Sequence, residues 1–253
     1  MAALGDFYET LAPFYDGLNG DLDYSKITAF LQQAFEKEGL GRPEIFLDAG
    51  CGTGSLSLLA DEFCDSVIGV DASFEMLCFA REKAFDAGKE ILFLEQNLLE
   101  LDLYGTVDAA LCAMDTLNHL PDEESFAAAL CRIALFVRPG GLLCFDLNTP
   151  YKHQEILGNH SLVKESEEAY CVWNNEYNDK DGSVEMTIDL FVGNEEDGYD
   201  RVSALQKEIL ISEETLQKAL KEAGLTLLSA TDDYSFEPLR ADSQRVTYLA
   251  RKN

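Results

Sequence analysis

Short apolar runs alternate with amphipathic stretches along the middle of the chain. The runs occupy residues 45–47, 67–70, 91–94, 107–111 and 142–145, and helical patterns fit between them. Strands that are buried on both faces form continuous apolar runs, and parallel strands are joined by crossover helices. The pattern therefore predicts an α/β fold with a mostly parallel sheet and helices on both of its faces.

The segment that follows Pro121 shows how such a helix is specified. Asp122 can cap its N-terminus, acidic residues fill its first turn, and apolar side chains recur at helical spacing from Phe126 to Val137. The run Arg138-Pro139-Gly140-Gly141 should then end it.

Two further amphipathic helices are expected ahead of the first strand. Apolar residues recur at helical spacing over residues 7–15 and 24–35, and a glycine-containing segment at 17–23 separates the two stretches. Residues 1–40 would thus form a helical lid over the domain. The alternative, which we prefer for the apolar side chains themselves, is that they pack the outside of the domain.

The hydrophobic period changes to two after the fifth apolar run. Alternation over residues 184–192 predicts an antiparallel strand. Glycine-containing loops on either side of it predict hairpins to strands at 170–177 and 199–211. Residues 151–211 are therefore expected to form a small antiparallel β insertion.

The α/β pattern resumes after this insertion. Ser212 can cap a helix that ends at Gly224, and two apolar runs follow at 225–230 and 246–250. These two strands would complete a seven-stranded sheet. The core of the domain then comprises residues 41–150 and 212–253.

The chain is strongly acidic, and this bears on its partners. It has 47 Asp and Glu against 19 Lys and Arg, for a formal net charge of −28. Such a charge repels a phosphate backbone unless a local basic patch overrides it, and none is visible. We therefore expect no DNA partner and a small-molecule or protein substrate, while most of the carboxylates solvate the surface.

Cysteine and histidine positions give little support to a disulfide framework or a metal site. The seven cysteines include no Cys-x-x-Cys pair, and His119, His153 and His160 have no metal-ligand spacing to them. Reduced core thiols and no metal are expected. No apolar stretch has the length of a membrane span and the N-terminus lacks a signal-peptide pattern, so a cytoplasmic protein without membrane contact is predicted.

A glycine-rich turn, Gly50-Cys51-Gly52-Thr53-Gly54, follows the first predicted strand and precedes a helical run. Ligands of open α/β sheets bind at this edge, where glycine lets the backbone approach closely. The dinucleotide fingerprint would need glycine at position 55, where Ser55 stands, so NAD is disfavoured. Asp71 ends the second strand, at the place of an acid that accepts hydrogen bonds from ribose hydroxyls.

At these residues the sequence resembles the class I S-adenosylmethionine-dependent methyltransferases, over nearly the whole chain. The segments 46–54, 70–73 and 115–120 are similar to the first, second and fourth-strand motifs of that family. The resemblance is closer to a bacterial branch of methyltransferases called YqeM-like, through Tyr15-Asp16-Gly17-Leu18, Thr149-Pro150-Tyr151-Lys152, Val172-Trp173-Asn174-Asn175 and Asp233-Tyr234-Ser235-Phe236-Glu237-Pro238. It implies a Rossmann-like seven-stranded methyltransferase sheet, mostly parallel with the last strand antiparallel, and S-adenosylmethionine as cofactor.

The resemblance also implies roles for individual residues. The turn glycines would hold the methionine part of the cofactor, Asp71 the ribose, and Met76 would pack near adenine. Asn97 departs from the family's usual Asp but can still hydrogen-bond the adenine amino edge. The residues implied to bind the cofactor are Tyr15, Asp48, Gly50, Cys51, Gly52, Gly54, Asp71, Ala72, Met76, Gln96, Asn97, Leu98, Asp115 and Asn118. Tyr15 would cover it from the lid, and Asp115 and Asn118 would face the methyl group; a purely structural role for these three is the alternative.

Methyl transfer from a sulfonium requires alignment and exclusion of water more than a dedicated base. A hydroxyl acceptor would need a base, for which His119, Tyr151 and His153 are candidates. For His119 we prefer a structural role in its loop.

Aromatic residues on the insertion leave its function open. Tyr170, Trp173 and Tyr177 would form an aromatic wall for the substrate or, as we prefer, pack the core; without such a wall the insertion could serve as a homodimer surface.

The sequence thus predicts methyl transfer from S-adenosylmethionine to N or O of a small-molecule acceptor. The alternatives are a non-catalytic S-adenosylmethionine-binding regulatory protein and a tRNA or protein methyltransferase. A nicotinamide-dependent dehydrogenase is disfavoured by Ser55.

Overall fold

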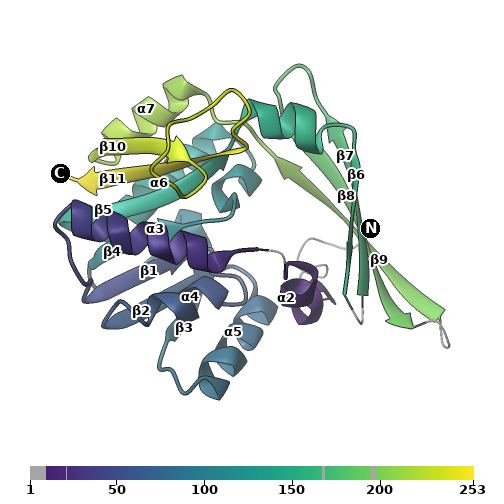
Figure 1. The fold of residues 1–253 in the computed structure, drawn as a ribbon, viewed down its shortest axis with the longest axis horizontal. Helices are drawn as coiled ribbons and strands as arrows, with labels where there is room; N and C mark the ends of the chain where they lie inside the picture. Colours follow the sequence, from purple (N-terminus) through teal and green to yellow (C-terminus); the bar gives the residue numbers. More distant parts are fainter. Residues whose placement is uncertain (1–9, 21, 167–168, 195–197) are drawn as a thin grey trace.

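A seven-stranded sheet in the order β10-β11-β5-β4-β1-β2-β3 forms the centre of the protein (Figure 1). The structure is a computed structural model, and it describes residues 10–20, 22–166, 169–194 and 198–253. The strands are β1 (Ile45–Ala49), β2 (Ser66–Asp71), β3 (Leu92–Glu95), β4 (Val107–Cys112), β5 (Val137–Asn148), β10 (Leu225–Asp232) and β11 (Arg245–Lys252). The first five run parallel, and β11 is antiparallel to both β5 and β10. The predicted mostly parallel sheet, with its last strand antiparallel, is confirmed.

Helices cover both faces of this sheet. One face carries α3 (Tyr24–Lys37), α4 (Ser55–Ala60) and α5 (Phe74–Asp86), and the other carries α6 (Glu123–Phe136) and α7 (Glu213–Glu222). Successive side chains of a strand point to opposite faces, so Phe46 packs with α3 and α4 while Leu47 packs with α6. Both residues are fully buried, which explains the uninterrupted apolar runs of the sequence.

The helices begin where side chains satisfy their free N–H groups. Asp122 accepts a hydrogen bond from the Ser125 N–H, and Ser212 accepts one from the Thr215 N–H, as the sequence predicts for α6 and α7. The predicted C-terminus of α6 is wrong by one residue. Val137, expected on the apolar face of the helix, has extended φ and ψ angles and begins β5.

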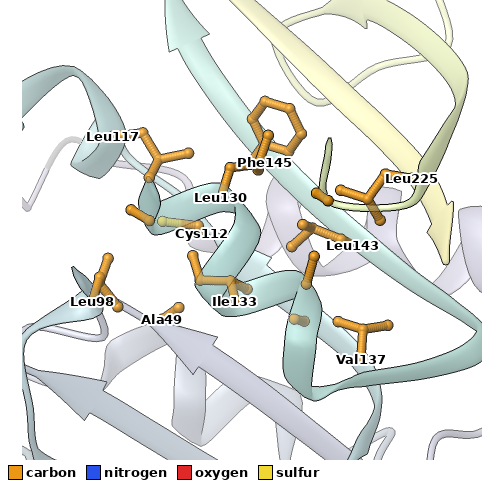
Figure 2. Close-up of a cluster of buried hydrophobic side chains, with 14 of the residues drawn as sticks. Ala49, Leu98, Cys112, Leu117, Leu130, Ile133, Val137, Leu143, Phe145 and Leu225 are labelled. Atoms are coloured by element: carbon orange, nitrogen blue, oxygen red, sulfur yellow. The ribbon is translucent and has the colours of Figure 1, made fainter. Parts of the chain in front are cut away.

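The core on the α6 side joins elements that are far apart in the chain. Figure 2 shows Leu130 and Ile133 of α6 against Leu143 and Phe145 of β5, with Leu225 of β10 beside them. All but Leu225, which is 5% exposed, are fully buried.

A second, four-stranded antiparallel sheet is inserted between β5 and α7. Its order is β6 (Ser161–Glu165), β7 (Ala169–Tyr177), β8 (Val184–Asn194) and β9 (Gly198–Glu208), and it projects from one side of the central sheet (Figure 1). The predicted insertion and its hairpin partners are present. Two elements were not predicted, β6 and the π-helix η4 (Lys152–Leu157). The strand expected through residue 211 ends at Glu208, because the Ile209 N–H leaves the sheet and donates to the Asn118 carbonyl at 2.9 Å.

One face of the inserted sheet is apolar and covered. Met186, Ile188 and Leu190 are buried in a cluster with residues of η1 (Ala12–Phe14) and α2 (Tyr15–Leu18). Figure 1 shows α2 between the two sheets.

The three aromatic residues of β7 do not share a face of this sheet. Trp173 and Tyr177 pack against the apolar cluster, whereas Tyr170 is 38% exposed on the opposite face. A single aromatic wall of all three side chains is therefore not formed.

Three further expectations concern the N-terminal helices, the cysteine thiols and membrane-spanning segments. The helix predicted at 24–35 is present as α3, but residues 7–9 of the one predicted at 7–15 lie outside the described residues. All seven cysteines are free, and five of them are buried as expected of core thiols, whereas Cys131 is half-buried and Cys78 is exposed. Among the described residues, no helix combines the length and the apolar character needed to cross a bilayer.

Leu130→Ala should lower the free energy of unfolding by about 2–5 kcal/mol, because it leaves a cavity in a close-packed core. Leu135→Ala is the matched control on the same helix, since Leu135 is 57% exposed, and it should change stability by less than about 0.5 kcal/mol. Urea unfolding followed by circular dichroism measures both, and equal losses would contradict the packing described for α6.

Candidate functional site

The glycine-rich turn between β1 and α4 is held against the end of β2. The N–H groups of Gly50 and Cys51 both donate to the Val70 carbonyl, at 2.7 and 2.9 Å. Gly50, Gly52 and Gly54 all have positive φ angles, of 82°, 52° and 76°, which L side chains rarely adopt. The turn therefore depends on glycine for its backbone conformation.

The three glycines differ in what surrounds them. A Cβ atom at Gly50 would lie 2.6 Å from the Thr116 side chain, and one at Gly54 would lie 2.9 Å from Ala80. A Cβ atom at Gly52 would meet no atom within 4 Å. Gly50 and Gly54 are thus required by packing, whereas Gly52 borders open space that a ligand could fill.

Asp71 at the end of β2 is bound to this turn. Its carboxylate accepts hydrogen bonds from the Gly52 N–H at 2.8 Å and from the Ser73 N–H at 2.9 Å, one on each oxygen. Burial raises the pKa of Asp71. Each oxygen keeps a second lone pair, so the group can position the turn and still accept a hydrogen bond from a ligand.

Asp48 lies beneath the turn and is 1% exposed. Its Oδ2 atom accepts a hydrogen bond from the Ser57 hydroxyl at 2.6 Å. Burial, together with the nearby charge of Asp71, raises the pKa of Asp48 to about 6. Its negative charge is therefore costly to the fold at neutral pH.

A short N-terminal segment is bound to the rim of the turn. Lys83 Nζ contacts Asp16 Oδ2 at 2.6 Å and the Ser55 hydroxyl at 2.8 Å, and the Thr53 hydroxyl donates to Asp16 Oδ1 at 2.7 Å. These contacts place Tyr15 in the wall of a cavity that the turn also lines. The sequence does not predict this cluster, because nothing in it distinguishes Asp16 and Lys83 from the other charged residues expected on the surface.

A larger cavity of about 620 Å³ adjoins the one at the turn. Tyr24 and Met114 line both cavities, so they stand at the boundary between them. The larger one is otherwise lined mainly by the start of α3 and by the β10–β11 connection, with Lys152 and Arg245 at its base.

The chain turns sharply where it leaves β4. Met114 and Asp115 both have positive φ angles, of 60° and 54°, and both donate their N–H groups to the Asp146 carboxylate at 2.7 Å. Asp146 is fully buried, and it also accepts from the Tyr234 hydroxyl and from Arg245, the latter at 3.3 Å. Neither Tyr234 nor Arg245 was predicted as a site residue, although Tyr234 lies in the segment 233–238 that carries the YqeM-like resemblance. A lone charged residue within the apolar run of β5 is a signal that could have indicated Asp146.

Arg245 and Lys152 set the charge of the Asp115 carboxylate. Arg245 donates to Asp115 Oδ1 at 2.8 Å, and Lys152 Nζ lies 3.9 Å from the same oxygen. Although burial opposes it, the charges of Lys152 and Arg245 hold the pKa of Asp115 well below its usual range. Asp115 is therefore an anion at neutral pH.

His119 lies beside two carboxylates from different parts of the chain. Its Nε2 atom is 3.7 Å from Asp115 Oδ2 and 3.9 Å from Glu208 Oε1, at the end of β9. Burial lowers the pKa of His119, but Asp115 and Glu208 outweigh that effect and raise it overall. Glu208 was not predicted, since nothing in its local sequence shows that β9 ends at this edge.

His153 is fully buried on the far side of Glu208. Its Nδ1 atom contacts the Gly182 carbonyl at 2.9 Å, and its Nε2 atom contacts Glu208 Oε2 at 3.1 Å. Tyr151, the third candidate catalytic residue, is half-buried at the start of η4.

Two other predicted site residues use their side chains in hydrogen bonds to main-chain groups of other residues. Asn118 is fully buried, donates to the Ile209 carbonyl at 2.8 Å and accepts from the Asn148 N–H at 3.0 Å. Gln96 uses both ends of its amide on the main chain of Asp102.

The remaining residues predicted to bind the cofactor lie in different environments. Asn97 is exposed and caps the short 3-10 helix η2 (Leu98–Glu100), and Leu98 belongs to the core. Met76 is 2% exposed in the apolar cluster beneath the inserted sheet, Ala72 is exposed, and Cys51 is buried with a raised thiol pKa.

Asp48→Asn should be more stable than the wild type at pH 8 by up to about 3 kcal/mol. The folded pKa of about 6 lies above the ordinary 3.8, so the folded state favours the proton and loses stability as pH rises through that interval. Asparagine keeps an acceptor for Ser57 and carries no charge. The advantage should shrink to about 1 kcal/mol at pH 4.5 in urea unfolding, and a difference that is constant with pH would contradict a neutral Asp48 in the fold.

Comparison with known proteins places this site in a family. Residues 46–141 match the family description "methyltransferase domain". A protein of Geobacillus sp. (strain WCH70) is 31% identical over 97% of this chain and 99% of its own length, and YqeM of Bacillus subtilis (strain 168) is 28% identical over 97% of each. Both names give a provisional methyltransferase assignment and no acceptor.

A solved structure agrees with these relatives. The crystal structure of an S-adenosylmethionine-dependent methyltransferase from Clostridium acetobutylicum ATCC 824 is similar to this chain, with a TM-score of 0.86 and 28% identity over 97% of this chain and 99% of that one. The chain therefore belongs to the class I S-adenosylmethionine-dependent methyltransferases, together with YqeM.

Proposed function

We propose that this protein transfers the methyl group of S-adenosylmethionine to a nitrogen or oxygen atom of a small molecule. The observation that carries the proposal is the pair of adjoining cavities, which share Tyr24 and Met114. One cavity belongs to the cofactor turn, and the other, of about 620 Å³, lies within the usual size of a small-molecule pocket. An acceptor in the larger cavity would approach the cofactor across Met114.

The residues at the turn suit the cofactor. The open space at Gly52 admits a ligand close to the backbone, and Asp71 retains acceptor capacity for ribose hydroxyls. Asn97 keeps its amide N–H group for the adenine side, because only its oxygen is used in capping. Gly50, Gly52, Gly54, Asp71 and Asn97 are thus the residues that we expect to hold the cofactor.

When bound, S-adenosylmethionine supplies an electrophilic methyl group and a good leaving group. The chain must then align the acceptor and exclude water. Tyr15, held by the contacts of Asp16 with Lys83, would shield the cofactor, and the strained turn at Met114 would guide the acceptor.

The candidate catalytic residues differ in access. His153 has both ring nitrogens engaged and no exposure, which favours positioning of Glu208 over contact with substrate. The His119 side chain is 33% exposed, and Tyr151 is half-buried, so both remain accessible to an acceptor.

Gly52→Ala should weaken S-adenosylmethionine binding by at least about 10-fold, a loss of about 1.4 kcal/mol, because the new methyl group occupies the ligand space. Gly39→Ala is the matched control, since Gly39 also has a positive φ, of 72°, and open surroundings, but lies after α3. Both variants should lose about 1–2 kcal/mol of stability from the left-handed backbone, and only Gly52→Ala should lose affinity. Calorimetric titration and urea unfolding separate the two effects.

Methyl transfer is tested with S-adenosylmethionine labelled in its methyl group. Calorimetry should first show binding of S-adenosylmethionine and S-adenosylhomocysteine, no binding of NAD, and a loss of adenosyl binding in Asp71→Ala. The enzyme and the labelled cofactor are then incubated together with a fraction of a cell extract. The small-molecule, protein and tRNA fractions are each used in a separate reaction. Label should pass to the small-molecule fraction.

A cavity variant links this transfer to the proposed acceptor site. Leu22→Trp, which places a large side chain in the wall of the larger cavity, should abolish transfer and leave cofactor affinity unchanged. Label in the tRNA or protein fraction would show that the acceptor is a macromolecule and would overturn the proposed small-molecule acceptor. Cofactor binding with no transfer to any fraction would favour a non-catalytic role.

A further inference from the structure

Three side chains from separate segments converge beside the larger cavity. Asp115 precedes the 3-10 helix η3 (Thr116–His119), His119 is its last residue, and Glu208 ends β9 of the inserted sheet. One oxygen of each carboxylate and one ring nitrogen of His119 all lie within 4.8 Å of one another. Two carboxylates and an imidazole are a common set of metal-binding groups.

The spacing of these atoms suits a shared ion better than direct hydrogen bonds. His119 Nε2 lies 3.7 Å from Asp115 Oδ2 and 3.9 Å from Glu208 Oε1, and both distances exceed a normal hydrogen bond. Ligand atoms at about 2.1 Å from a tetrahedral metal ion are separated by about 3.4 Å. A small closure of the three side chains would therefore create that coordination geometry.

Each carboxylate uses its other oxygen for support. Asp115 Oδ1 accepts from Arg245 at 2.8 Å, which leaves Oδ2 toward His119. Glu208 Oε2 accepts from Asn148 at 2.6 Å and contacts His153 at 3.1 Å, which leaves Oε1 toward His119. Metal-binding carboxylates are typically fixed by outer hydrogen bonds of this kind.

The inward oxygen of Glu208 lacks a protein donor. The Glu208 side chain is 4% exposed, and within the described ranges of the chain no group donates a hydrogen bond to Oε1. Glu208 Oε1 is not among the buried side-chain atoms of the described residues that lack a partner, so it stays open to solvent and is free to coordinate a cation.

We propose that Asp115, His119 and Glu208 bind one divalent transition-metal ion. Imidazole together with carboxylates favours Zn²⁺, Mn²⁺ or Fe²⁺ over Mg²⁺ and Ca²⁺, which prefer oxygen alone. The two carboxylates offset the charge of the ion. Arg245 and Lys152, at 2.8 and 3.9 Å from Asp115 Oδ1, add positive charge beside the site, and Asp146, at 3.3 Å from Arg245, offsets part of it. The partial exposure of His119 leaves room for a further ligand.

The proposed site differs from the expectation of no metal, which considered only the spacing of cysteines and histidines. It also adjoins the proposed reaction centre, because Asp115 directly follows Met114, which lines both cavities. An ion here would act as a Lewis acid toward a hydroxyl oxygen of the acceptor and lower the pKa of that hydroxyl. That use rests on the proposed function, whereas metal binding itself does not.

The test is calorimetric titration of Zn²⁺ into the full-length protein after removal of metals with a chelator. The wild type should bind one equivalent. His119→Gln and Glu208→Gln should weaken binding by at least about 100-fold, since loss of a group that only supports a ligand already costs about 10–100-fold. Visible absorption of Co²⁺ in the same samples reports whether the ion has protein ligands.

Matched controls address the acidic surface and the chance of misfolding. His160 and Glu36 are exposed, so His160→Gln and Glu36→Gln remove the same groups elsewhere and should bind Zn²⁺ like the wild type. Far-ultraviolet circular dichroism checks the fold, and His119→Gln keeps the test valid if the buried Glu208→Gln variant is unstable.

The outcomes separate the two proposals. No binding by the wild type, or equal binding by all variants, would overturn the metal site and leave His119 paired with the two carboxylates. Titration of each variant with S-adenosylhomocysteine is independent of the metal, so a failure of cofactor binding would count against the proposed function alone.

Discussion

The buried carboxylate of Asp146 is the interaction on which both parts of the site depend. An isolated carboxylate without exposure to water would cost several kcal/mol, but this one accepts from two main-chain N–H groups, a tyrosine hydroxyl and a guanidinium. In return it holds Met114 and Asp115 in left-handed conformations that cost about 1–3 kcal/mol each. Met114 borders both cavities and Asp115 carries a carboxylate toward His119, so one buried charge positions both.

Much of the fold could be predicted because its signals are local. Continuous apolar runs mark strands covered on both faces, and Asp122 and Ser212 mark helix starts through short-range hydrogen bonds. β6 could not be predicted in this way. Its five residues alternate between exposed and half-buried positions, so they form no continuous apolar run. Val137 was misplaced for a related reason, since an apolar residue satisfies the pattern of a helix end and of a buried strand equally well.

The candidate site also divides into residues that local sequence signals predict and residues that only the folded chain brings together. The glycine turn and Asp71 lie in one short stretch, and the backbone geometry that they require can be inferred from residue type and spacing alone. The groups around His119 come from β4, β5, β9 and β11, so only the folded chain brings them together. Resemblance implied a cofactor-side role for Asn118, but the use of its amide by Ile209 and Asn148 depends on an insertion whose path the sequence does not specify.

The paired hydrogen bonds between Asn118 and Ile209 have an evolutionary consequence. They join the end of the inserted sheet to η3, which follows β4, so a displacement of the hairpin sheet is transmitted to that edge of the central sheet. The glycine turn, on the opposite flank of β1, shares none of these contacts. Mutations that change the twist or length of the hairpins would therefore move Glu208 and η3, and they would also reach the rim of the glycine turn through the apolar cluster that the inserted sheet shares with α2 and Met76. Evolutionary change in the hairpins is thus coupled to both sides of the candidate site rather than confined to one.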